Sequence, residues 1–339
     1  RNVAVGNESL KSNTTGRINT AIGDGTLSLN TTGSSLVAVG VSALRDNTSG
    51  TYNTALGTQA LIYNTTGSWN VALGIGSMFE NHTGSKNTAI GSRSFNFSYS
   101  GDENTAVGYE ALRSVWSVFG GNQNTAFGAS ALNEISTGSG NVALGYATMG
   151  GLSTGSYNTA IGYISGGMTT GQLNTTIGAY SSVSGTETQN GTALGYGALV
   201  SSSNKIRLGN TSVTVIEGQV PYTNSSDRRI KREITGTKYG LKTVLKLRPV
   251  DYQLKSNDLF QVGFIAQDLK PVVPEAVMGI EGDLEKGETL GVAYTTLIPV
   301  LTKAIQEQQA LIENQQQSIE AQNKVIQQLQ KDMLILKQK

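Results

Sequence analysis

A serine and a lysine five residues apart are the side chains in this sequence best suited to joint chemistry. Ser226 and Lys231 lie in the string Ser-Asp-Arg-Arg-Ile-Lys-Arg-Glu-Ile. A serine hydroxyl is a poor nucleophile until a base removes its proton, and a neutral lysine can be that base. Since the ordinary pKa of lysine is about 10.4, burial or nearby cations must lower it, and Arg228, Arg229 and Arg232 are available as cations. By itself, such a pair is more typical of a solvated basic linker than of a catalytic dyad.

The remaining composition excludes several other classes of site and partner. His82 is the only histidine, it lies in a polar turn where a solvated side chain is expected, and cysteine is absent. We therefore expect no metal site and no cofactor. Residues 1–220 carry 9 Lys/Arg against 10 Asp/Glu, and residues 221–339 carry 16 against 14, so nucleic acid is not an expected partner. No apolar run of about 18 residues occurs, which argues against membrane insertion.

A five-residue unit, Asn-Thr/Val-Ala-apolar-Gly, recurs through the N-terminal part of the chain. Nine of the eleven steps between its glycines are 17 residues, one is 20 and one is 16. A second column of glycines adds another turn to each unit. The pattern predicts a mostly β fold over residues 1–203, a β-solenoid with two short strands in each coil. A flexible linker would not keep this phase over twelve units. The glycines of the unit are Gly6, Gly23, Gly40, Gly57, Gly74, Gly91, Gly108, Gly128, Gly145, Gly162, Gly178 and Gly195.

The positions within each unit predict which side chains share a face of the strand. The Thr/Val and Ile/Leu positions lie two apart and share one face of a strand, and the intervening alanine points to the opposite face, which must be one that accepts only a small residue. Asparagine occupies the first position in ten of the twelve units. Stacked coils would align these amides into a hydrogen-bonded ladder.

Two further segments follow the repeats. Residues 204–225 are predicted to form a β neck and cap that ends in a linker, with a strand at Val213–Ile216. Residues 297–339 show a heptad with isoleucine at one core position and leucine or glutamine at the other, which predicts a trimeric coiled coil. A single amphipathic helix folded onto its own domain is the alternative. The two core columns are Ile298, Ile305, Ile312, Ile319, Ile326 and Met333, and Leu301, Gln308, Gln315, Gln322, Leu329 and Leu336.

A three-residue insertion interrupts the repeat between residues 109 and 123. It carries Trp116 and Phe119, which a threefold fibre would present three times at one height. Exposed aromatic side chains on a loop suit a receptor, with a glycan or a protein as candidates. The alternative is that both rings pack against the local coil.

The repeats resemble the head repeats of trimeric autotransporter adhesins and of some phage tail fibres. The sequence from Ser226 onward resembles the chaperone domain at the end of endosialidase-type phage tail spikes and fibres, which also occurs in myelin regulatory factors. Ala293 departs from the acidic residue common in that family. Five ordered motifs carry the second resemblance: Ser226-Asp227 through Lys231; Leu245, Arg248-Pro249-Val250 and Tyr252; Gly263–Gln267; Pro274-Glu275; and Tyr294 to Leu297, leading into Ala304–Glu307.

The resemblances imply a function and a processing event. They imply a homotrimer in which residues 226–296 are an intramolecular chaperone and a single-turnover serine autopeptidase, with Ser226 and Lys231 as the catalytic pair. The cut would lie between Ser225 and Ser226, made directly or through an ester. The expected protein is a host-attachment fibre of a phage tail or phage-like particle. The alternative is a bacterial surface adhesin; a glycan-degrading spike is disfavoured, because residues 1–220 show no paired carboxylates.

Overall fold

The computed structural model describes residues 1–339 except 115–119, 168–169, 221–222, 256–258, 285–287 and 338–339. Trp116 and Phe119 therefore lie outside the described residues. The chain divides into two compact units, Arg1–Thr214 and Val215–Lys339. Each unit is described by itself.

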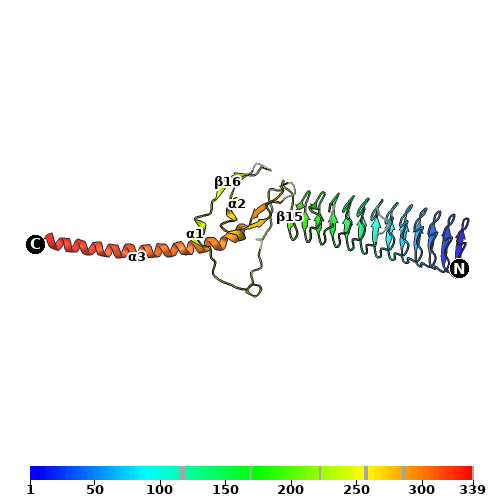
Figure 1. The fold of residues 1–339 in the computed structure, drawn as a ribbon, viewed down its shortest axis with the longest axis horizontal. Helices are drawn as coiled ribbons and strands as arrows, with labels where there is room; N and C mark the ends of the chain where they lie inside the picture. Colours follow the sequence, from blue (N-terminus) through cyan, green and yellow to red (C-terminus); the bar gives the residue numbers. More distant parts are fainter. Residues whose placement is uncertain (115–119, 168–169, 221–222, 256–258, 285–287, 338–339) are drawn as a thin grey trace. The chain divides into compact units, whose positions relative to one another are not determined.

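The first unit is a parallel β-solenoid (Figure 1). Thirteen strands form one sheet in chain order, and each pairs in parallel with the same positions of the next repeat, as Ala72 does with Ala89. The predicted solenoid of 17-residue repeats is thus confirmed. The strands of this sheet are β1 (Asn2–Val5), β2 (Asn19–Ile22), β3 (Val37–Val39), β4 (Thr54–Leu56), β5 (Val71–Leu73), β6 (Thr88–Ile90), β7 (Thr105–Val107), β8 (Thr125–Phe127), β9 (Val142–Leu144), β10 (Thr159–Ile161), β11 (Thr175–Ile177), β13 (Thr192–Leu194) and β15 (Ile206–Leu208).

The small residue of the repeat faces inward, on the side of the strand opposite to its apolar neighbours. In β6, Ala89 is fully buried, whereas Ile90 on the other face is 40% exposed. The glycine after each strand is required by the stacking. Gly74 has φ +131°, and a Cβ there would lie 2.5 Å from the carbonyl oxygen of Gly91 in the next coil. A side chain at this column would push adjacent coils apart.

The expectation of two strands in every coil is wrong for most of the solenoid. Only β12 (Ser182–Val183) and β14 (Leu199–Val200) form a second ladder among the described residues. In other coils the second segment is a series of turns, because its buried leucine has a positive φ, as at Leu61 with +52°. The backbone N–H of Leu61 still donates to the carbonyl of Ser77 at 3.0 Å, so the coils remain hydrogen-bonded there without strand geometry.

Two asparagine ladders run through the stacked coils. In the predicted ladder, each side-chain oxygen accepts from the backbone N–H one coil later, as Asn53 does from Asn70 at 2.9 Å. The second ladder belongs to the Asn-Thr/Ser turns and was not predicted. Its amides bond directly to one another, as Asn64 does to Asn47 at 2.8 Å. These contacts satisfy polar groups that are fully buried.

The second ladder ends abruptly at Ser98. It runs through Asn13, Asn30, Asn47, Asn64 and Asn81 at intervals of 17 residues, and the next position holds Ser98. Within the described structure, the side-chain oxygens of Asn81 and Ser98 are both buried without a hydrogen-bond partner. The serine is too short to continue the ladder, and an unpaired buried polar group lowers stability by about 1–3 kcal/mol.

The substitution Ser98→Asn is expected to stabilise the solenoid, because its amide can donate to the side-chain oxygen of Asn81. We expect a gain of about 1 kcal/mol, seen as a rise of roughly 2 °C in the thermal midpoint. Ser98→Ala is the control, since it leaves the oxygen of Asn81 unpaired. Calorimetry that ranks Ser98→Asn at or below Ser98→Ala would rule out this explanation of the ladder's end.

The second unit has two small antiparallel sheets and a long helix. Its core is built by Leu269, Val273, Ala276, Leu297 and Val300. The strand expected at Val213–Ile216 is absent, and these residues are exposed without ladder pairing. The elements are η1 (Arg228–Ile230), α1 (Leu241–Val244), β16 (Val250–Gln253), β17 (Phe260–Gly263), α2 (Ala266–Leu269), η2 (Pro274–Ala276), β18 (Val277–Gly279), β19 (Leu290–Val292), η3 (Tyr294–Thr296) and α3 (Leu297–Lys337).

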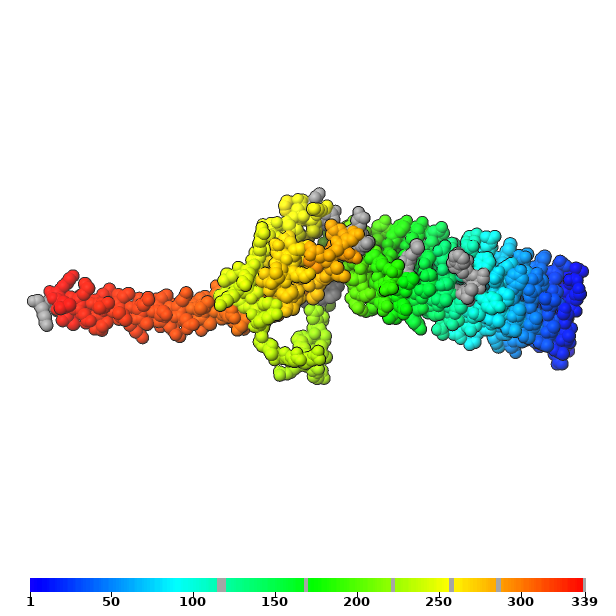
Figure 2. Space-filling model, viewed as in Figure 1, coloured from blue at the N-terminus to red at the C-terminus, as the bar shows by residue number. Residues whose placement is uncertain are grey.

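Helix α3 packs on its own unit only at its start. Leu297, Val300 and Ala304 are its buried residues, and every described residue from position 308 onward is exposed. Figure 2 shows the later turns, in red, with no other segment of the unit against them. The alternative of an amphipathic helix folded along its own domain is therefore wrong for most of α3.

Candidate functional site

The structure brings the predicted serine and lysine into direct contact. The ammonium Nζ of Lys231 donates to the hydroxyl Oγ of Ser226 at 2.6 Å. This is hydrogen-bond distance between a nucleophile and a candidate base, which is the geometric requirement for activating the hydroxyl. Ser225, on the other side of the expected cut, precedes Ser226 directly and is also exposed.

A single turn of 3₁₀ helix, η1, separates the two side chains. Asp227 caps this turn, with its Oδ1 accepting from the backbone N–H of Arg229 at 2.8 Å. The turn closes at Lys231, whose backbone N–H donates to the carbonyl of Arg228 at 3.2 Å. Aspartate is a preferred capping residue, so its position before Arg228–Ile230 was a readable signal that the sequence prediction did not use.

The charges beside the pair are partly neutralised. The guanidinium of Arg229 binds the carboxylate of Asp227, with Nη2 2.6 Å from Oδ2. This hydrogen bond lowers the pKa of Asp227 and raises the pKa of Arg229, so both groups stay charged. Because its charge is paired with Asp227, Arg229 is poorly suited to the expected role of a cation acting on Lys231.

The site is open in the single chain. All residues from 223 to 238 are exposed, Ser226 and Lys231 included. Within the described part of the second unit, no element covers the pair, so this unit does not bury the two side chains.

Other motif residues form the framework of the unit and do not join the pair. The hydroxyl of Tyr294 accepts from the backbone N–H of Phe264 at 3.1 Å. A Cβ at Gly263 would collide with that hydroxyl, which explains why this motif position is a glycine. The carboxylate of Glu307 accepts from the N–H of Leu241 at 2.8 Å and ties α3 to α1.

Glu275, from the Pro-Glu motif, links the segment after the pair to η2. Its Oε2 accepts from the hydroxyl of Tyr239 at 2.6 Å, and its Oε1 lies 3.3 Å from Nζ of Lys238. The hydrogen bond from Tyr239, together with the nearby Lys238, lowers the pKa of Glu275. Glu275 thus has a structural partner and is not placed as a second base for Ser226.

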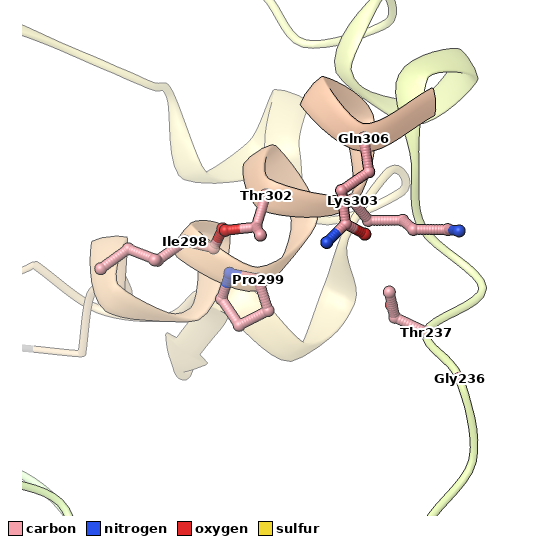
Figure 3. A pocket seen from close by; sticks show the side chains of 7 residues that line it. All are labelled: Gly236, Thr237, Ile298, Pro299, Thr302, Lys303 and Gln306. Carbon is pink, nitrogen blue, oxygen red and sulfur yellow. The ribbon is translucent and has the colours of Figure 1, made fainter. Parts of the chain in front are cut away.

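An open groove of about 690 Å³ lies between the extended segment at Gly236 and the first turns of α3 (Figure 3). Among the described residues that line it, Lys303 alone is ionisable, and neither Ser226 nor Lys231 lines it. The groove is therefore separate from the candidate pair. Its lining residues are Gly236, Thr237, Ile298, Pro299, Thr302, Lys303 and Gln306.

Comparison with known families identifies the segment that contains the pair. Residues 226–278 match the family model Peptidase_S74, described as chaperone of endosialidase. The match begins at Ser226, and it confirms the resemblance drawn from the motifs. A β-solenoid followed by such a segment is consistent with a tail fibre or tail spike that carries a C-terminal chaperone domain. No curated protein matches the chain.

The family is associated with trimeric, phage-related extracellular fibres and suggests a trimerisation chaperone with autoproteolysis. Across the described residues, no helix is both long and apolar enough for a membrane span. In the same residues, no group of three or more His, Asp or Glu side chains is arranged to hold a metal ion.

Proposed function

We propose that this chain forms a homotrimeric attachment fibre whose C-terminal segment guides assembly and is then removed by a cut between Ser225 and Ser226. The contact of 2.6 Å between Lys231 and Ser226, at the first residue of the family match, carries the proposal. In this reading, residues 1–203 are the shaft, 204–225 the neck and linker, 226–296 the chaperone, and 297–339 the coiled coil.

The proposed cut is an acyl transfer followed by hydrolysis. Neutral Lys231 accepts the proton of Ser226, and Oγ of Ser226 attacks the carbonyl carbon of Ser225. The bond from that carbon to the nitrogen of Ser226 breaks, and Lys231 returns the proton to the leaving amine. A water molecule then hydrolyses the resulting ester, which leaves a carboxylate on Ser225 and restores the hydroxyl of Ser226. One peptide bond and one water are consumed, and no cofactor is required.

Helix α3 supports the trimer. Its isoleucine column is exposed along the helix, with Ile305 65% and Ile312 50% accessible. A long helix with an unpartnered apolar column gains little stability by itself in water, because most helical stability comes from packing of that face. Isoleucine-rich cores favour trimers, and the glutamine layers at Gln308, Gln315 and Gln322 fit a seam that sets register and oligomeric state.

The shaft presents a second surface for association. Its sheet places an apolar side chain on the outer face of nearly every coil, and a contiguous exposed apolar face is typical of an interaction surface. We propose that this face packs against the other two copies. The exposed apolar residues of the sheet include Ile22, Val37, Leu56, Ile90, Phe127, Val142, Leu144, Ile177, Leu194 and Leu208.

The repeat explains why a chaperone is needed. Because the strands pair at the same positions every 17 residues, a chain displaced by one coil would present almost the same side chains. Helices that join first in a fixed register would remove this ambiguity before the slow non-local β structure forms. A cut made afterwards would leave a fibre held by its unfolding barrier.

Native mass spectrometry of the full chain carrying Ser226→Ala tests the assembly step without processing. We expect a mass of three uncut chains. A monomer at micromolar concentration would contradict the proposed trimer, whatever the outcome for the cut. The receptor is proposed to be a cell-surface molecule, with a glycan among the candidates, and Trp116 and Phe119 remain predicted contact residues outside the described structure.

A further inference from the structure

The short turn between Ser226 and Lys231 determines whether the two side chains can meet. An extended chain would separate residues five apart by roughly 17 Å, far beyond the reach of a lysine side chain. The turn η1 shortens this separation, and Nζ of Lys231 lies 2.6 Å from Oγ of Ser226. The contact therefore depends on whatever stabilises this turn.

Among the described residues of the second unit, the contacts that stabilise the turn are local hydrogen bonds. Its residues are exposed, and η1 has no buried residue that could anchor it in the core. Asp227 makes two of the contacts: its side chain accepts from the N–H of Arg229 at 2.8 Å, and its carbonyl accepts from Ile230 at 3.2 Å. The carboxylate also binds the guanidinium of Arg229, but an ion pair this exposed contributes little.

We propose that Asp227 is a positioning residue for the cut and acts through the capping hydrogen bond that holds Lys231 opposite Ser226. The inference rests on the proposed function of this pair. It assigns Asp227 no direct contact with the reacting carbonyl. The cap, and not the negative charge, is what the reaction needs, so an uncharged side chain able to accept the same hydrogen bond should serve.

The test measures the rate of self-cleavage in full-length chains made by cell-free synthesis, with timed samples separated on a denaturing gel. Native mass spectrometry of the same samples measures the amount of trimer. The cleavage rate is then expressed per trimer, so that a variant that assembles poorly is not scored as one that cuts slowly. Asp227→Ala is expected to cut about tenfold more slowly, from the usual effect of losing a cap. Asp227→Asn, which keeps the acceptor, is expected within about twofold of the unmodified chain.

Arg229→Gln is the matched control, because it removes the ion pair but keeps the backbone N–H that the cap engages. It is expected within about twofold of the unmodified rate. The proposal is overturned if Asp227→Ala cuts as fast as the unmodified chain, or if Asp227→Asn is as slow as Asp227→Ala. Cleavage that persists in Ser226→Ala would instead refute the pair itself, so the two failures are distinguishable.

Discussion

Replacing Ser226 by alanine is expected to leave the chain as a single species on a denaturing gel, with the trimer retained. The substitution removes the hydroxyl that Lys231 contacts, and loss of a nucleophile of this kind lowers the rate on the order of a thousandfold or more. Lys231→Arg should have the same effect, because arginine keeps its proton and cannot act as the base.

Ser225→Ala is the matched control for this experiment. Ser225 is adjacent and equally exposed, but its role in the proposed reaction is confined to its carbonyl group. The variant should therefore still be cut at the same bond. An intact Ser225→Ala chain, or fragments from Ser226→Ala, would show that the nucleophile has been assigned to the wrong residue.

Substitutions in the isoleucine column of α3 are expected to have a second large effect, on the oligomeric state. The double substitution Ile312→Asp and Ile319→Asp should convert the trimer to monomer and stop the cut along with it. Each change would bring three carboxylates together in an apolar layer, which costs several times the thermal energy. Sedimentation and gel analysis of one preparation measure both consequences.

Ala310→Asp and Gln317→Asp together make the control for the helix. These positions lie on the side of the heptad away from both core columns and are exposed in the structure. The control adds the same charges to the same turns and should remain a trimer that is cut normally. If the chain with both isoleucines replaced is still a trimer, association depends on another surface, such as the sheet of the shaft.

The repeat phase was sufficient to predict the solenoid, because strand alternation places the alanine on the face opposite to its apolar neighbours. The structure shows which face is inside, since Ala89 is buried and Ile90 is exposed. The second strand in each coil was not predictable in the same way. Leu61 is buried like a strand residue, yet its positive φ places it in a turn, and a hydrophobic pattern does not distinguish these two ways of burying leucine.

The candidate pair was predictable only as a pair of residue types. Spacing alone did not show whether Lys231 reaches Ser226, because that depends on a turn of three residues capped by Asp227. The sequence prediction treated Arg229 only as a cation near Lys231, so it did not include the ion pair of Arg229 with Asp227. The 17-residue spacing of Asn47 and Asn64 was visible in the sequence. Predicting a hydrogen bond between their amides would also have required knowing that adjacent turns stack.

The exposure of Ser226 and Lys231 bears on when the proposed cut takes place. Ser226 and Lys231 lie on an exposed turn in the single chain, and the proposed reaction uses neutral Lys231 as its base. If three copies enclose this segment, cleavage would follow assembly and would not precede it. The double substitution in α3 tests this order directly, since it removes assembly without altering either residue of the pair.

Self-cleavage before Ser226 can be measured from the intact masses of the denatured, unmodified protein. We expect two polypeptides, residues 1–225 and residues 226–339, with the second beginning at Ser226. A fragment that begins at any other residue, or a full-length chain that persists in a mature trimer, would contradict this expectation.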